Sequence, residues 1–102
     1  MRIVWLKSAV ESLRSLHAWI ATENPIAARQ VAQAIRTATF RLGDFPSSGR
    51  IGMVPGTREI VLANLPYLIV YRIHDQRVEI LRVFHTSRNY PSMRATGFPP
   101  VV

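Results

Sequence analysis

Cysteine is absent from this chain of 102 residues, and lysine occurs only once, at Lys7. Without thiols there are no disulfides and no thiolate metal sites, a composition that fits a reducing compartment. No apolar run reaches the roughly 18 residues that a membrane span requires. The first residues, MRIVWLKS, also lack the long apolar stretch of a signal peptide. We therefore predict a cytoplasmic protein without a membrane partner.

Signatures of metal and cofactor sites are missing as well. His17, His74 and His85 are far apart in the sequence, and no pair of carboxylates accompanies them. No glycine-rich phosphate loop opens a helix, because most of the glycines gather in residues 43–56. We predict neither a bound metal ion nor a cofactor.

Acidic residues are scarce, with 6 against 13 basic residues and a net charge of +7. Nearly all the basic residues are arginines, whose planar guanidinium grips phosphate or carboxylate. The charge predicts an acidic or polyanionic partner, although a GC-rich genome would also favour arginine over lysine. The hydrophobic fraction of 48% is enough for one core. We predict a single domain over residues 1–102, with residues 91–102 as a flexible tail or a segment strapped along the sheet.

Apolar residues at helical intervals predict two consecutive helices. The segment SAVE at residues 8–11 has the spacing of a capping box, so the first helix should begin there and end near Thr22. Asn24 and Pro25 then supply an N-cap and a first helical residue for the second helix. Gly43 is its expected C-cap. The short connection makes the pair a helical hairpin.

Strand-like segments flank this hairpin, with residues 2–6 before it and residues 58–63, 67–73 and 78–84 after it. Residues 43–57 are rich in glycine, proline and serine and predict a long ordered loop. Both helices need an apolar surface, and the sheet needs a cover. The predicted fold is therefore α+β with two layers. An N-terminal strand is followed by a helical hairpin, which packs on one face of a mostly antiparallel sheet of about four strands.

Alternation along the strands predicts what the uncovered face of the sheet carries. Burying Arg72 or Arg82 without a partner would be unfavourable, so we place both on that face. The same face then carries apolar side chains, and an apolar patch bordered by arginine is typical of a protein-binding surface. The residues predicted to bind a partner or a nucleic acid are Leu68, Val70, Arg72, Ile80, Arg82 and Arg50.

Several motifs occur in a characteristic order. They are the helix restart ENPIAARQ, the strand PGTREIVL, and PYLIVYRI followed after a turn by RVEILRVFHTSRN. Together they resemble the RelE/ParE superfamily of toxins from type II toxin–antitoxin modules, also known as plasmid-stabilisation proteins. The resemblance extends from Ile3 to about Pro91. It implies a bacterial growth inhibitor that is neutralised by a cognate antitoxin, whose extended C-terminal segment wraps around the toxin.

The resemblance also concerns the target. RelE-like members resemble ribonucleases that cut mRNA on the ribosome, whereas ParE-like members resemble inhibitors of DNA gyrase that do not themselves catalyse a reaction. The ribonuclease branch usually carries an arginine directly after the residue that opens the third strand, where this chain has Leu68. Leucine cannot stabilise the charge of a phosphorane, and the ending RVFHTSRN is closer to ParE-like members. The resemblance therefore favours the ParE branch and gyrase.

The same ending keeps a ribonuclease hypothesis open. Metal-free RNA cleavage needs an acid–base group and a cation at the phosphate. His85 can supply the first and Arg82 with Arg88 the second, because imidazole titrates near neutral pH and guanidinium binds phosphate. Tyr90 can stack on a base. Structural roles remain the alternative: a backbone hydrogen bond for His85, an ion pair with Glu79 for Arg82, and packing of the tail for Tyr90. A third hypothesis is a module that has lost toxicity and only binds its antitoxin.

Overall fold

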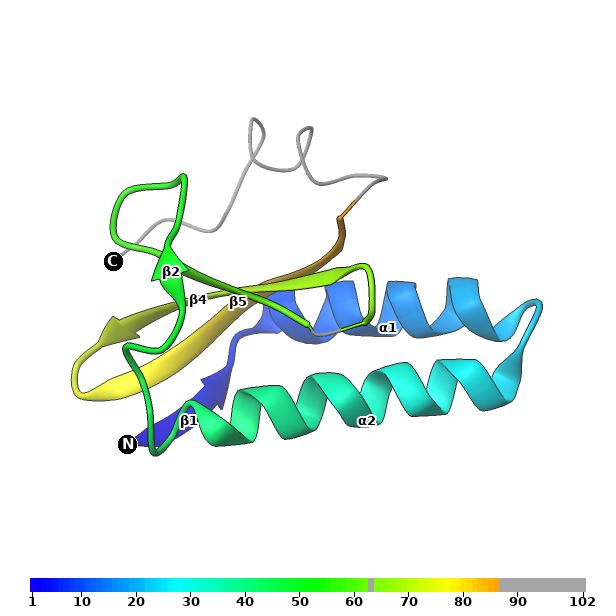
Figure 1. Ribbon diagram of the computed structural model, residues 1–102, viewed down its shortest axis with the longest axis horizontal. Helices are drawn as coiled ribbons and strands as arrows, with labels where there is room; N and C mark the ends of the chain where they lie inside the picture. The colour runs from blue at the N-terminus through cyan, green and yellow to red at the C-terminus, as the bar shows by residue number, and fades with distance from the viewer. Residues whose placement is uncertain (63, 87–102) are drawn as a thin grey trace.

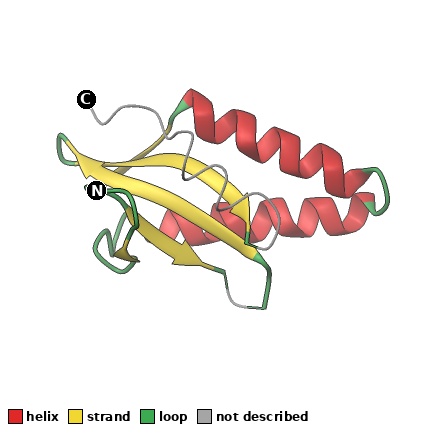
Figure 2. Ribbon diagram, turned by 90° about the horizontal axis from the view of Figure 1, so that it is seen from above, coloured by secondary structure: helices red, strands yellow, loops and turns green. Residues whose placement is uncertain are grey.

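The computed structural model of the protein describes residues 1–62 and 64–86. Over these residues, two helices cover one face of a five-stranded sheet (Figure 1, Figure 2). This arrangement confirms the predicted two-layer α+β fold, with one strand more than predicted. In chain order the elements are β1 (Arg2–Trp5), α1 (Lys7–Ala21), α2 (Pro25–Arg41), β2 (Arg50–Ile51), β3 (Arg58–Val61), β4 (Tyr67–His74) and β5 (Arg77–His85).

The strand order in the sheet is β1-β5-β4-β3-β2. β1 is parallel to β5, with Ile3 opposite Val78, and the other neighbouring strands are antiparallel. The additional strand, β2, lies in the segment predicted as a loop and pairs with the start of β3. Its two residues are too few for an alternating pattern, which is why the sequence does not reveal it.

The start of α1 differs from its prediction. The helix begins at Lys7, Leu6 holds the cap position, and no side chain caps it. Ser8 was predicted as the capping residue, but its Oγ donates a hydrogen bond to the carbonyl oxygen of Leu81 at 2.8 Å. The capping-box prediction is therefore wrong, because the hydroxyl is used between layers of the fold and not within the helix.

α2 begins as predicted but has a different end. Asn24 Oδ1 accepts a hydrogen bond from the backbone N–H of Ala27 at 3.0 Å, which confirms the N-cap. At the other end, Leu42 holds the cap position in a right-handed conformation, so the prediction of Gly43 as the cap is wrong. Gly43 provides space instead, since a Cβ there would lie 3.0 Å from the carbonyl oxygen of Met1.

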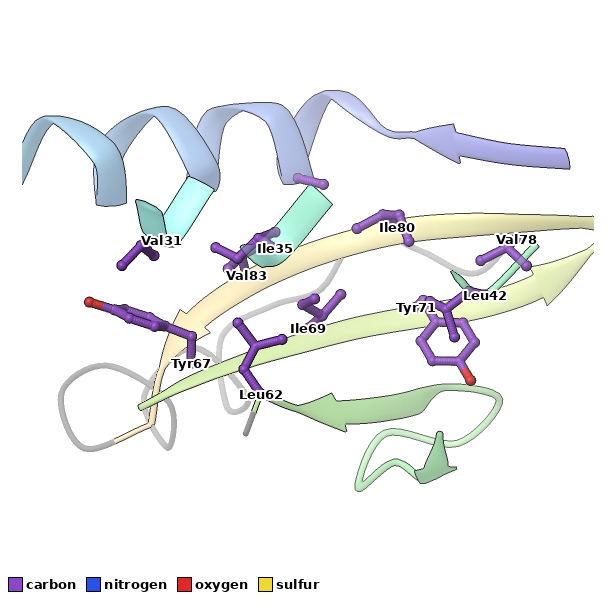
Figure 3. Packing of buried hydrophobic residues seen from close by; sticks show 11 residues of the cluster. Val31, Ile35, Leu42, Leu62, Tyr67, Ile69, Tyr71, Val78, Ile80 and Val83 are labelled. Atoms are coloured by element: carbon purple, nitrogen blue, oxygen red, sulfur yellow. The ribbon is translucent and has the colours of Figure 1, made fainter. Parts of the chain in front are cut away.

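The main core lies between the helices and the sheet (Figure 3). Ile69 and Tyr71 enter it from β4, whereas Ile35 enters it from α2 and Leu42 from the residue after that helix. All four side chains are fully buried. Burial of an aliphatic side chain of this size stabilises the fold by roughly 1.5–3 kcal/mol. These contacts hold the helical hairpin on the sheet.

A β-bulge in β5 changes which side chains face the helices. Tyr71 pairs with Ile80, but the preceding residue, Val70, pairs with Arg82, so β5 carries one extra residue between the two pairs. As a result, Ile80 and Val83 both lie in the main core beneath the helices. The prediction that Ile80 lies on the uncovered face is wrong for this reason. Arg82 lies on the face away from the helices, as predicted, because it is opposite Val70.

That face holds a second, smaller apolar cluster. It consists of Leu68, Val70, Leu81 and Phe84, with Leu6 packed against it. Leu68 and Val70 were correctly predicted on this face, but both are fully buried. Leu68 lies opposite Phe84 in the pairing of β4 with β5, where the large ring packs in the same cluster. The prediction of an exposed apolar patch at these positions is therefore wrong.

Candidate functional site between α1 and β5

α1 lies along the edge of β5 that β1 leaves open. β1 ends at Trp5, and beyond this point the next residues of β5 have α1 as their neighbour. Ser8 Oγ donates to the carbonyl oxygen of Leu81 at 2.8 Å. One turn later, Ser12 Oγ accepts a hydrogen bond from the backbone N–H of Val83 at 3.0 Å. The helix thereby satisfies backbone groups that a further strand would otherwise pair.

A groove of about 460 Å³ runs between α1 and the C-terminal half of β5, and is termed the α1–β5 groove. Glu11, Ser15 and Trp19 line it from the helix, and Arg82 and His85 line it from the strand. Side chains from both faces of β5 reach it because it follows the edge of the sheet. The fold thus brings together two of the predicted catalytic residues, an arginine and a histidine, with a carboxylate nearby.

His85 lies between two aromatic rings at the end of β5. Its ring centroid is 5.9 Å from that of Trp19 and 5.3 Å from that of Tyr67. Both contacts are edge-to-face, with interplanar angles of 80° and 86°, a geometry that aromatic pairs prefer. Burial of Tyr67 raises the pKa of its phenol, so this ring stays neutral. The imidazole therefore joins the end of β5 to α1 and β4, in addition to lining the groove.

Arg72 does not present its charge to solvent, which corrects the sequence prediction. The register places it opposite Glu79, and its Nε lies 2.6 Å from Oε1 of that carboxylate. Arg77 Nη2 lies 2.6 Å from the other oxygen, Oε2. Burial would raise the pKa of Glu79, but hydrogen bonds from Arg72 and Arg77 outweigh it and hold this pKa below its usual value. The hairpin of β4 and β5 contains a buried ion pair of Arg72 with Glu79, and the partly exposed Arg77 contacts the same carboxylate.

Arg50, another predicted binding residue, is on the surface. Its side chain is 61% exposed, and its Nη2 lies 3.1 Å from Oε1 of the buried Glu59. The two remaining predicted catalytic residues, Arg88 and Tyr90, lie outside the described residues, as does the predicted tail at 91–102. The structure therefore brings Arg82 and His85 into one groove, leaves Arg50 at the other end of the sheet, and buries Arg72.

The contribution of α1 to the groove was missed from the sequence. Residues at intervals of three and four share one face of a helix, and this face carries Ser8, Ser12, Ser15 and Trp19. Small hydroxyl side chains in such a row suit contact with backbone groups better than contact with an apolar core. This row of serines indicates a helix face that contacts backbone groups. Which strand it contacts is decided by the tertiary structure.

Two features that other functions would require do not occur in residues 1–62 and 64–86. No three side chains among His, Cys, Asp and Glu gather so that they could hold a metal ion there. Within the same part of the chain, neither helix has the length and apolar character needed to cross a membrane.

Comparison with known proteins identifies the family. A sequence model of the family described as the ParE toxin of the type II toxin–antitoxin system parDE matches residues 3–90. The chain belongs to this family. This ParE-family chain is 42% identical over 92 residues to the toxin candidate Y4kP of Sinorhizobium fredii, covering 90% of this chain and 95% of the relative. It is 32% identical over 87 residues to the toxin RelE2 of Caulobacter vibrioides, covering 85% and 97% of the two chains.

Solved structures share the fold. A chain of the chromosomal ParDE toxin–antitoxin system from P. aeruginosa has a TM-score of 0.77 at 23% identity, covering 85% of this chain and 97% of that one. A chain of the intact E. coli RelBE toxin–antitoxin complex has a TM-score of 0.62 at 16% identity, covering 85% and 98%. The predicted membership of the RelE/ParE superfamily of type II toxins is confirmed.

Proposed function

We propose that this ParE-family toxin inhibits bacterial growth by binding DNA gyrase and does not itself catalyse a reaction. The observation that carries the proposal is the side chain at position 68. The ribonuclease branch of the superfamily usually has an arginine there, whereas Leu68 is fully buried in the apolar cluster that contains Phe84. A buried leucine offers no charge to a phosphorane, and a cationic group at the phosphate is a main requirement of metal-free RNA cleavage.

Two further contacts give two of the candidate residues structural roles that require no catalysis. Arg72 is held in a buried ion pair with Glu79, and His85 is packed between Trp19 and Tyr67. Groups with such contacts contribute to the stability of the fold, whether or not they meet a substrate. A binder needs a stable surface, and its activity does not depend on a proton donor at any one of these positions.

We also propose that an antitoxin binds and neutralises the chain in the cytoplasm. The similar solved structures come from systems named ParDE and RelBE, each described as a toxin–antitoxin system or complex. The net charge of +7 favours an acidic antitoxin segment. Leu68, Val70 and Ile80 are buried and would have to be uncovered to meet it. Arg50 and Arg82 are proposed as contacts.

The decisive experiment measures both activities of the purified chain. A gyrase binder will inhibit negative supercoiling of plasmid DNA by purified gyrase and will leave mRNA intact on purified translating ribosomes. Induced cells should become filamentous and show DNA-damage signalling before translation falls. Cleavage of ribosome-bound mRNA without any effect on gyrase would refute the proposal. A chain that is harmless on induction would instead favour a module that only binds its antitoxin.

A second candidate function is ribosome-dependent cleavage of mRNA. The α1–β5 groove favours it, because Arg82 and His85 line the same groove and could contact a phosphate and transfer a proton. Arg88 and Tyr90 would complete the set predicted from the sequence. This hypothesis requires that His85→Ala abolishes mRNA cleavage while the variant stays folded, as measured by circular dichroism. Inhibition of gyrase by the same variant would separate the two functions.

A further inference from the structure

The segment between α2 and β3 is fixed by side chains from the sheet. Tyr71, whose ring is fully buried, accepts a hydrogen bond on its hydroxyl from Gly49 N–H at 2.9 Å and donates to the carbonyl oxygen of Pro46 at 2.7 Å. A Cβ at position 49 would lie 2.6 Å from that hydroxyl, so only glycine fits. Arg58 Nη1 adds a hydrogen bond to the carbonyl oxygen of Gly49 at 2.8 Å.

The next part of the segment is held by one buried carboxylate. Glu59 is 3% exposed, and its Oε1 accepts from Nε of Arg50 at 3.2 Å. Its Oε2 accepts from the backbone N–H of Met53 at 3.2 Å. The carboxylate therefore holds the chain on both sides of Ile51. These two hydrogen bonds fix the positions from which the side chains of Arg50 and Met53 reach the surface.

Beyond Met53 the segment closes on itself. Gly52 N–H donates to the carbonyl oxygen of Thr57 at 2.8 Å, and Thr57 Oγ1 donates to that of Val54 at 2.6 Å. Gly56 has a φ of +82°, a conformation that favours glycine. Residues 46–57, here named the β2 loop, thus combine little regular structure with many internal hydrogen bonds. In Figure 1 the part of the loop that follows β2 rises on the side of the sheet opposite α2.

This ordered loop presents two large apolar side chains to solvent. Ile51 and Met53 are each 75% exposed, and the neighbouring side chain of Arg50 is 61% exposed. Neither apolar side chain contributes much to the core. The hydrogen bonds of the loop satisfy the buried hydroxyl of Tyr71 and the buried carboxylate of Glu59, and they also fix the backbone that carries the two apolar side chains. A loop fixed before binding loses little conformational entropy when a partner covers it. Apolar anchors on a rigid support are typical of the centre of a protein interface.

We propose that Ile51 and Met53 in the β2 loop are the anchors by which this toxin binds its protein target. The partner surface is an apolar pocket bordered by carboxylates, because the guanidinium of Arg50 lies beside the anchors and the chain carries a net charge of +7. The inference rests on the proposed function, since it locates the contact with the target of growth inhibition.

The test compares two double variants in the full chain. Ile51→Ser with Met53→Ser removes the anchors. Ile26→Ser with Phe40→Ser is the control, because it removes two side chains on α2 that are 61% and 76% exposed. Growth inhibition after induction and half-inhibition of supercoiling by purified gyrase are the readouts. We expect the anchor variant to be weaker by about tenfold or more and the control to stay within about twofold.

Thermal unfolding monitored by circular dichroism shows whether each variant is folded. If the anchor variant unfolds at a lower temperature, the single Met53→Ser change, which lies outside β2, carries the test. An anchor variant as potent as the wild type would overturn the inference and leave the proposed function intact. Equal losses of potency in the anchor variant and the control would have the same meaning. The wild type could stop growth without affecting gyrase while the anchor variant is harmless. This result would refute gyrase as the target and support the β2 loop as the contact with the target. A wild type that does not inhibit growth would overturn both.

Discussion

The Nε atom of Arg72 lies 2.6 Å from Oε1 of Glu79, and the two side chains are 7% and 2% exposed. They are opposite each other in the pairing of β4 with β5. A buried pair of this kind adds little net stability over a matched apolar pair, but removal of one partner leaves the other charge unpaired in the interior. The stability of the long hairpin is therefore sensitive to this one carboxylate.

We predict that Glu79→Gln lowers the free energy of unfolding by about 3–5 kcal/mol, because Arg72 keeps its charge and loses its buried counterion. Urea denaturation at pH 7, followed by circular dichroism, measures the change. Glu11→Gln is the matched control, since this carboxylate is 62% exposed and lies 3.9 Å from Lys7. The control should change stability by less than about 0.5 kcal/mol. A loss of similar size in both variants would contradict the prediction.

Acid should destabilise the wild type more than the Glu79→Gln variant. Folding lowers the pKa of Glu79, so its contribution to stability is complete above the usual carboxyl pKa of about 4.3. The contribution is lost as the pH falls through the lower pKa of the folded state. We expect a smaller decrease in the free energy of unfolding between pH 5 and pH 3 in the variant. Parallel curves for the two proteins would show that this carboxylate is not linked to folding.

Local sequence signals predicted the parts of the fold that depend on local chemistry. Asn24 and Pro25 mark the start of α2 because a cap needs only a side chain and its own next turn. The turn between β4 and β5 is similar, since Asp75 and Gln76 both adopt positive φ in a two-residue connection. Local signals do not predict the five-strand arrangement or the parallel pairing of β1 with β5, because both depend on which distant segments of the chain pair.

The bulge in β5 is the main reason that the predicted site differs from the observed one. Strict alternation places Val83 on the same side as Glu79, but the extra residue between Ile80 and Arg82 moves Val83 into the main core. No glycine or proline marks this position in the sequence. Arg72 was misjudged for another reason: its partner Glu79 is seven residues away and becomes its neighbour only when the hairpin forms.

Ser12 should matter more to stability than the other two serines on the same face of α1. Ser12→Ala leaves the backbone N–H of Val83 without its hydroxyl acceptor, and we expect a loss of about 1–3 kcal/mol. Ser8→Ala removes the hydroxyl that donates to the carbonyl oxygen of Leu81. A buried carbonyl tolerates the loss of a hydrogen bond better than a buried N–H does, so this variant should lose less stability. Ser15→Ala is the control on an exposed position. Urea denaturation ranks the three variants, and an order with Ser15 first would contradict this account.

Tyr71→Phe should loosen the β2 loop. The change removes the hydroxyl that joins Gly49 to Pro46, at a cost of about 1–3 kcal/mol. Burial raises the pKa of Tyr71, so the hydroxyl is protonated at neutral pH and can donate as described. Faster hydrogen exchange of the Gly49 amide, measured by NMR, is the expected result. Tyr67→Phe, which leaves this loop unchanged, is the control, and equal exchange in all three proteins would mean that the hydroxyl does not hold the loop.

The imidazole of His85 separates the binding and nuclease hypotheses. A phenylalanine ring can reproduce its edge-to-face contacts with Trp19 and Tyr67 but cannot transfer a proton. We therefore expect His85→Phe to fold like the wild type and to inhibit gyrase and growth within about twofold of it. A general acid or base contributes typically about 100-fold or more, so a nuclease would lose at least that factor. His85→Ala removes the ring contacts as well, and its lower thermal stability would show that these contacts stabilise the fold. Loss of growth inhibition in a stably folded His85→Phe variant would argue for catalysis in the α1–β5 groove.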